Sequence, residues 1–226
     1  MIEVRGLIKT YKAGGQTYRA VDNATFTVEK GRMVSIMGHS GSGKTTLLSL
    51  IGGLTRPDSG TVAIDGIDLW SVDDNALSTM RNRKMSFIYQ FSSLIPTLTV
   101  YENVLLPLAF GNATGDAGDY AHELVGKVGL KDKIDVFPSQ LSGGQQRRAA
   151  IARAFINRPE IVLADEPTGD LDEETEREIM ALFRTMNKER GMTFVIVTHS
   201  SELAAEADVK MRMTHGVVGG VDASFG

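Results

Sequence analysis

The stretch from Met33 to Leu48 constrains the fold of this chain more than any other. An apolar run leads into the glycine-rich segment Gly38-His-Ser-Gly-Ser-Gly-Lys-Thr45, and residues with a helical pattern follow it. The first glycine and the closing Gly-Lys-Thr have the spacing of the Walker A pattern, and a strand before it and a helix after it are the context that this pattern requires. The stretch therefore predicts a phosphate-binding loop in an α/β fold.

The residue types in this loop explain how it would hold phosphate. Gly38, Gly41 and Gly43 let the backbone curl so that successive N–H groups face an anion, and the following helix adds the positive end of its dipole. Lys44 can reach the terminal phosphates. Thr45 offers a hydroxyl to Mg²⁺, which prefers hard oxygen ligands. The alternative, an ordinary Gly/Ser loop, does not require Lys-Thr directly after the last glycine.

A second strong signal is the run Ile161 to Glu166, in which an apolar segment ends in two acids. A parallel strand buried on both faces has a continuous apolar sequence, and open α/β sheets bind ligands at the carboxyl ends of their strands. Asp165 is therefore expected to hold magnesium, directly or through its waters, and Glu166 to orient or deprotonate a water that attacks the last phosphate. A pair of surface acids is the alternative, and it leaves the apolar run unexplained.

Two further polar residues are predicted at strand ends. The apolar run 193–198 delivers His199 to the same edge as the two acids, which favours a contact with the terminal phosphate over a purely structural role. Gln90 closes a predicted strand at 87–90 and has the chemistry to bind magnesium or the attacking water. Taken alone, Gln90 is better explained as a solvated glutamine at a strand end.

Three residues have two readings each. Tyr11 is expected in the turn between short antiparallel strands near residues 2–5 and 24–28, where stacking on a base and simple packing are equally compatible with the sequence. Ser142 precedes two glycines and a predicted helix that includes residues 149–154, which gives either a helix cap or a second anion site. Asp172 opens an acidic run that is best explained as the first turns of a helix, without a binding role of its own.

The remaining patterns predict helices and strands to which we assign no catalytic or binding residue. A helix is expected from Thr46 to Leu54, buried on several sides, and a strand within 60–66 that joins the N-terminal strands in a small β subdomain. Residues 102–136 have a helical pattern interrupted by a flexible insert at 111–118.

Composition limits the possible functions. The formal charge of -4 and the lack of a Lys/Arg block argue against non-specific nucleic-acid binding as the main activity. The chain has no cysteine, which excludes disulfides, thiolate metal sites and cysteine nucleophiles and fits a reducing cytosol. The N-terminal residues lack the features of a secretory signal and no segment has the length of a membrane span, so a membrane role is expected to need a partner chain.

In this order along the chain, these motifs resemble those of an ABC-type ATPase subunit, and the segment Leu141-Ser-Gly-Gly-Gln145 is specific to that family. The resemblance implies that Glu166 is the catalytic base and His199 the switch histidine, with Lys44 and Gln90 as further catalytic residues. It implies magnesium ligation by Thr45, Gln90 and Asp165. The nucleotide-binding residues that it implies are Tyr11, Gly38, His39, Ser40, Gly41, Ser42, Gly43, Lys44, Thr45, Thr46, Ser142, Gly143, Gly144, Gln145 and Asp172.

The resemblance also implies a fold and partners. The fold is α/β: residues 1–226 are expected to form a single ABC ATPase domain with a RecA-like P-loop NTPase core of mainly parallel sheet, a small antiparallel β subdomain and a helical subdomain at about 91–154. The implied cofactors are ATP and Mg²⁺. ATP would close a head-to-tail dimer of two copies and hydrolysis would reopen it. A transmembrane permease subunit would hold the cytoplasmic ATPase at the inner face of the membrane, and no nucleic-acid partner is expected.

Within the family, the segments 90–104 and 165–172 are similar to those of the lipoprotein-release and macrolide-export group. Three positions depart from that group's pattern, Asp170 in place of asparagine, His39 in place of proline and His215 in place of an acid before glycine. An ABC ATPase that regulates a membrane-anchored cell-wall or division complex, without transport, is the alternative function.

Overall fold

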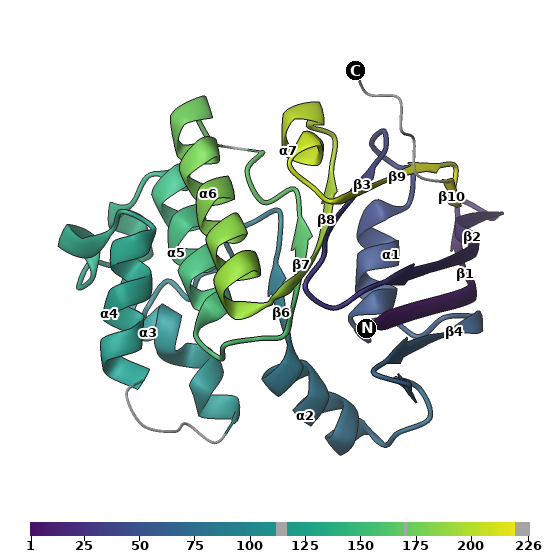
Figure 1. Ribbon diagram of the computed structural model, residues 1–226, viewed down its shortest axis with the longest axis horizontal. Helices are drawn as coiled ribbons and strands as arrows, with labels where there is room; N and C mark the ends of the chain where they lie inside the picture. The colour runs from purple at the N-terminus through teal and green to yellow at the C-terminus, as the bar shows by residue number, and fades with distance from the viewer. Residues whose placement is uncertain (112–116, 170, 220–226) are drawn as a thin grey trace.

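The computed structural model describes residues 1–111, 117–169 and 171–219, which form two sheets with helices around them (Figure 1). Asp170 and residues 112–116 of the expected insert lie outside the described residues. Among the described residues, no helix is both long and apolar enough to cross a membrane.

The larger sheet has six strands in the order β10-β9-β3-β8-β7-β6, and only the β10–β9 pair is antiparallel. Its central strands β7 and β8 are buried along their whole length, as their continuous apolar sequences predict. The prediction of a P-loop NTPase core with a mainly parallel sheet is confirmed. The strands are β3 (Met33–Met37), β6 (Met85–Ile88), β7 (Ile161–Asp165), β8 (Thr193–Thr198), β9 (Val209–Thr214) and β10 (Val217–Gly219).

The smaller sheet is antiparallel, in the order β2-β1-β4-β5, as expected for the N-terminal β subdomain. Its strands are β1 (Ile2–Ala13), β2 (Gln16–Val28), β4 (Ser59–Ile64) and β5 (Ile67–Asp68). The expected position of Tyr11 in a turn is wrong. Gly14 and Gly15, both at positive φ, make the hairpin turn, so β1 and β2 extend up to them and Tyr11 pairs with Tyr18 across the strands.

Helix α1 (Lys44–Ile51) lies between the two sheets (Figure 1). Its leucines pack against apolar residues of both, including Val21 and Val62 on the small sheet and Val195 on the large one. This burial on several sides agrees with the sequence prediction. The helix ends at Gly52, where a Cβ atom would overlap the ring of Phe87. Sheet packing therefore fixes α1, and with it the loop that α1 continues.

Most other helices cover the opposite side of the large sheet, around a core that includes Phe155, Phe183 and Phe194. They are α3 (Val100–Leu105), α4 (Ala117–Lys127), α5 (Gly143–Phe155) and α6 (Glu173–Arg190), with 3-10 turns at Leu106–Phe110, Lys131–Lys133 and Pro138–Gln140. Gly191, in the left-handed region, follows the last residue of α6. Helices α2 (Asp74–Lys84) and α7 (Ser201–Ala205), like β9 and β10, have no counterpart among the elements expected from sequence.

The segment between β6 and α3 has no regular secondary structure, and the side chain of Asn103 holds its backbone. Asn103 is fully buried; its Nδ2 donates to the carbonyls of Ile95, Leu98 and Thr99 at 3.1, 3.0 and 2.9 Å, and its Oδ1 accepts from Ile95 N at 2.7 Å. One amide thus bonds four backbone groups of the segment, of which the carbonyls of Ile95 and Thr99 also accept backbone N–H groups, at 3.2 and 2.9 Å.

Replacing this amide should therefore cost stability. We expect Asn103→Ala to lower the free energy of unfolding by about 2–4 kcal/mol, because it removes the hydrogen bonds of a fully buried amide and opens a cavity. Urea denaturation measures the change. Asn75→Ala, on the exposed face of α2, is the matched control and should stay within about 0.5 kcal/mol of wild type. Equal stability of the two variants would contradict the role of Asn103.

Candidate active site

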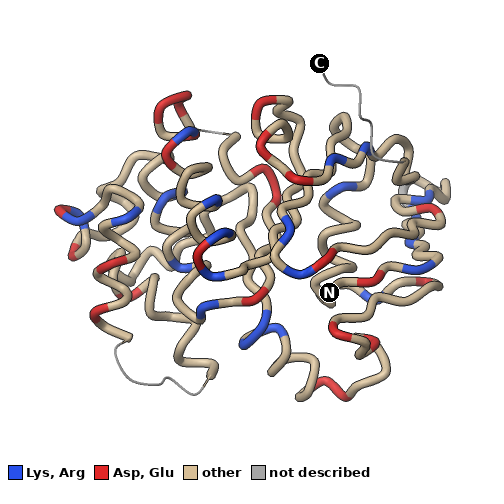
Figure 2. The backbone as a smooth tube through the Cα atoms, in the orientation of Figure 1, with Lys and Arg blue, Asp and Glu red and all other residues tan. Residues whose placement is uncertain are grey.

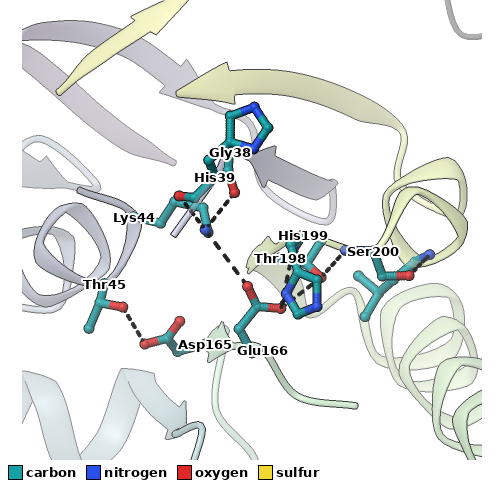
Figure 3. A network of polar contacts seen from close by, with 10 residues as sticks. Gly38, His39, Lys44, Thr45, Asp165, Glu166, Thr198, His199 and Ser200 are labelled. Carbon is teal, nitrogen blue, oxygen red and sulfur yellow. Dashed lines mark hydrogen bonds and ion pairs between the residues drawn. The ribbon is translucent and has the colours of Figure 1, made fainter. Parts of the chain in front are cut away.

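A cavity of about 580 Å³ opens at the carboxyl ends of the parallel strands, where the sequence predicts the ligand site. The glycine-rich loop after β3 forms one wall, and the residues that follow β7 and β8 form another (Figure 3). The described residues that line the cavity are Tyr18, Ala20, His39, Ser40, Gly41, Ser42, Gly43, Lys44, Thr45, Thr46, Gln90, Asp165, Glu166 and His199.

The loop has space only for glycine where it touches neighbouring backbone. A Cβ atom on Gly43 would overlap the carbonyl oxygen of Ala20, and one on Gly38 would overlap that of Met213. At Gly41, by contrast, a Cβ atom would meet nothing within 4 Å, so there the φ of 77° is the reason for glycine. The loop therefore packs against β2 and β9 on one side, and its other side, at Gly41, is open.

The loop and the start of α1 fit a bound polyphosphate. Gly43 caps α1 without a side-chain hydrogen bond, which leaves first-turn N–H groups facing the cavity mouth for an anion. The Ser42 hydroxyl is buried and has no hydrogen-bond partner in the described part of the chain. Buried polar groups without partners are rare, and a ligand that supplies the missing partners explains them.

Lys44 lies at the centre of the site and is only 8% exposed. Its amine donates to the carbonyl oxygens of Gly38 and His39, at 2.7 and 3.3 Å, and lies 3.8 Å from Oε1 of Glu166. The loop thus holds a buried positive charge beside its carbonyl oxygens, with one carboxylate near by (Figure 3). Such a charge attracts the terminal phosphates of a nucleotide.

Asp165 and Thr45 meet between β7 and α1. The Thr45 hydroxyl donates to Oδ2 of Asp165 at 2.8 Å, and Asp165 is almost completely buried. Burial raises the pKa of Asp165, and the charge of Glu166 raises it further, while the hydrogen bond from Thr45 lowers it. A carboxylate and a hydroxyl so close together fit Mg²⁺, which needs few protein ligands.

Glu166 follows β7 with a φ of 45°, a conformation that residues other than glycine rarely adopt. Its backbone N–H donates to the Val197 carbonyl at 2.9 Å, which ties it to β8. Oε2 accepts hydrogen bonds from the Thr198 hydroxyl at 3.0 Å and the His199 N–H at 3.2 Å, and Nδ1 of His199 lies 2.9 Å away. These contacts hold the Glu166 carboxylate against the end of β8.

Gln90, Ser142 and Asp172, which were also predicted as site residues, lie at three separate positions. Gln90 follows β6, is exposed and lines the cavity. Ser142 caps α5 in a capping box with Gln145, and Asp172 caps α6 by accepting from Thr175 N at 2.9 Å. None of the described residues that line the cavity belongs to 142–145, and Asp172 does not line it either. One copy of the chain therefore brings together only part of the predicted set.

Tyr18 lines the cavity and had no predicted role, whereas Tyr11 stands behind it, with ring centroids 5.9 Å apart. A signal for Tyr18 exists in the sequence. A hairpin centred on Gly14-Gly15 pairs residues in equal steps on either side, which sets Tyr18 opposite Tyr11. Thr198 was also missed as a site residue, because a threonine that ends an apolar strand gives no sequence signal for a polar contact.

A phosphate loop after β3, a lysine buried within it and two acids at the end of β7 define a P-loop nucleoside triphosphatase. The family model described as "ABC transporter" matches residues 21–169. The lipoprotein-releasing system ATP-binding protein LolD of Bordetella pertussis is 42% identical over 95% of this chain and 94% of its own length. The macrolide export ATP-binding/permease protein MacB of Rhodopirellula baltica is 44% identical over 96% of this chain, which spans about a third (32%) of that protein.

Two solved structures have the same fold. The dimeric ABC transporter cassette MJ0796 superposes with a TM-score of 0.91 and 43% identity over 96% of both chains, and its dimeric post-hydrolysis state with ADP and Pi matches with a TM-score of 0.91 and 42% identity. This chain belongs to the ABC transporter family, as an ATP-binding subunit. It is an ATPase of that family, and its resemblance to the lipoprotein-release and macrolide-export group is confirmed.

The raised pKa of Asp165 predicts a stability change that depends on pH. The unfolded chain releases the Asp165 proton at a lower pH than the folded chain does. The free energy of unfolding therefore falls as pH rises from the pKa of the unfolded state to that of the folded state. Above the folded pKa, the full cost of burying the charged carboxylate is present. We therefore expect nucleotide-free Asp165→Asn to melt at a higher temperature than wild type at pH 7. The gap should close below about pH 3.5.

A second carboxylate provides the control. Hydrogen bonds from Thr175 lower the pKa of Asp172, so its contribution has the opposite sign and Asp172→Asn should not raise the melting temperature at pH 7. Mg²⁺ with ATP should raise the melting temperature of wild type more than that of Asp165→Asn. A lower melting temperature for Asp165→Asn at pH 7 would contradict the burial cost.

Proposed function

We propose that this chain hydrolyses ATP with Glu166 as the base, and that the hydrolysis cycle drives a permease of the lipoprotein-release and macrolide-export group at the inner face of the membrane. The observation that carries the catalytic part is the position of Glu166. Its carboxylate stands at the end of β7, with one oxygen 3.8 Å from the buried amine of Lys44 and the other bonded to residues of β8 and the turn after it.

Each residue has a distinct role in this proposal. Lys44 exchanges its carbonyl partners for oxygens of the terminal phosphates, and the first-turn N–H groups of α1 bind the same phosphates. Thr45 and Asp165 hold Mg²⁺, joined by Gln90. When bound, Mg²⁺ neutralises negative charge on the phosphate oxygens.

The reaction is an in-line displacement at the terminal phosphorus. The oxygen of a water molecule forms a bond to phosphorus, the bond to the leaving oxygen of ADP breaks, and the water proton passes to Glu166. His199, whose side chain is mostly exposed to the cavity, orients the terminal phosphate.

The incomplete lining of the cavity supports a composite site. Ser142 and its glycines lie at the N-terminus of α5, outside the cavity of their own chain, although an N-terminus of this kind binds anions. In a head-to-tail homodimer, residues 142–145 and Asp172 of one copy would close on the nucleotide that Lys44 of the other copy holds. ATP would stabilise the closed dimer, and its hydrolysis would release it.

The segment after Gln90 supports contact with a permease. Phe91 and Ile95 expose large apolar side chains there, with Phe91 77% exposed, and Tyr89, just before Gln90, is also exposed. The backbone that carries them is held by α5: Arg147 donates to the Tyr89 carbonyl, and Arg153 donates to those of Ser92 and Ser93 at 2.9 Å each. Large exposed apolar side chains on a fixed backbone favour a protein interface.

Two substitutions test the catalytic roles. Glu166→Gln should still bind ATP but lower kcat by roughly 10³-fold or more, because the amide cannot take the water proton, and ATP-bound dimer should accumulate in gel filtration. Lys44→Ala should lose ATP affinity and stay monomeric. Wild-type turnover by Glu166→Gln, or unchanged ATP binding by Lys44→Ala, would contradict the assignment.

A third prediction concerns the base of the nucleotide. We propose that the tyrosine pair of the β1–β2 hairpin stacks on adenine, with Tyr18 nearest the phosphate loop and Tyr11 behind it. Tyr18→Ala should weaken ATP binding by roughly 10-fold, since one base–aromatic stack is worth about 1–3 kcal/mol, and Tyr18→Phe should bind as wild type does. Titration calorimetry measures both affinities. A larger loss in Tyr11→Ala than in Tyr18→Ala would reverse the order of the pair.

A further inference from the structure

We infer that Thr198 is a positioning residue for hydrolysis, which fixes the oxygen of Glu166 that faces the attacking water. The inference rests on the proposed role of Glu166 as the base. Thr198 is the last residue of β8, and only 1% of it is exposed. It lies one strand away from Glu166 and beside His199 (Figure 3).

The hydrogen bonds around the Thr198 hydroxyl determine its direction. Ser200 N–H donates to Oγ1 of Thr198 at 3.0 Å, which occupies the hydroxyl as an acceptor. The hydroxyl proton is then directed to Oε2 of Glu166, which lies 3.0 Å away. A β-branched side chain on a buried strand has few rotamers, so this donor is held rigidly.

The two oxygens of the Glu166 carboxylate therefore have different surroundings. Oε2 accepts from the Thr198 hydroxyl and the His199 N–H, and Nδ1 of His199 lies 2.9 Å from it. Oε1 is directed toward Lys44, whose amine lies 3.8 Å away, on the side of the phosphate loop. With Oε2 engaged by donors, Oε1 is the oxygen with capacity to accept the proton of a water molecule.

Thr198 holds Glu166 in a way that the His199 ring cannot maintain throughout the cycle. The His199 side chain is 70% exposed, and its proposed contact with the terminal phosphate takes the ring away from Glu166. The Thr198 hydroxyl is buried and has no such second task. When nucleotide is bound, the hydroxyl of Thr198 and the backbone N–H of His199 would remain to orient the carboxylate.

The test uses three variants of strand β8. Thr198→Val removes the hydroxyl at nearly constant volume, and Thr198→Ser restores it. Thr193→Val is the matched control, because Thr193 is a buried threonine at the other end of the same strand whose hydroxyl accepts from Gly31 N at 3.0 Å. We expect Thr198→Val to lower kcat roughly 10- to 100-fold with a KM for ATP within about 2-fold of wild type, since a misplaced base slows the chemical step alone.

A nucleotide-free crystal structure gives a readout that does not depend on turnover. Glu166 should leave its position in Thr198→Val and keep it in Thr198→Ser, while Thr198→Ser and Thr193→Val should have the kcat of wild type. Wild-type kcat in Thr198→Val, or an equal fall of kcat in Thr193→Val, would overturn the inference. If Glu166→Gln stalls while Thr198→Val turns over normally, only the Thr198 inference fails; if Glu166→Gln itself turns over normally, the proposed function fails with it.

Discussion

The buried amine of Lys44 is the interaction on which the rest of the site depends. A charge removed from water is costly unless other groups compensate it, and here the compensation comes from two loop carbonyls and the more distant carboxylate of Glu166. Three features of the fold produce this arrangement. Packing of α1 between the sheets fixes the lysine, the glycines let the loop carbonyls approach it, and the parallel order of β3, β8 and β7 carries Glu166 to the same edge. Phosphate oxygens satisfy that amine better than carbonyls do.

Sequence predicted the parts of the fold whose signals are local and strong. The glycine loop, the apolar runs that became β7 and β8, and the helix after Asp172 each carry their own periodicity or cap. Elements with weaker signals were missed: α2 is mostly polar, and β9 alternates over a short length. Tyr11 was misplaced because β1 and β2 are longer than the short apolar runs used to predict them and continue up to the turn at Gly14 and Gly15. Thr198 was missed because only the fold brings its hydroxyl to Glu166.

Glu166 has partners on two sides of the site. Without nucleotide, Glu166 is shared between Lys44 and the donors of β8 and His199 (Figure 3). Figure 2 shows acidic and basic residues interspersed over the rest of the described chain. The exposed apolar residues after Gln90 favour a protein partner, and the backbone that carries them is bonded to α5, the helix that Ser142 caps.

The central claim is that Lys44 and Ser142 work on the same nucleotide only across two copies, and mixing two inactive variants tests it most directly. Lys44→Ala removes the phosphate-binding amine, and Ser142→Arg blocks the exposed N-terminus of α5. In a mixed dimer, one of the two sites combines an intact Lys44 with an intact Ser142. The account predicts that equal mixing restores ATPase activity, up to about half of wild type per copy, since neither variant completes a site with itself and each mixed dimer has one intact site of two. No recovery over either variant alone would contradict it.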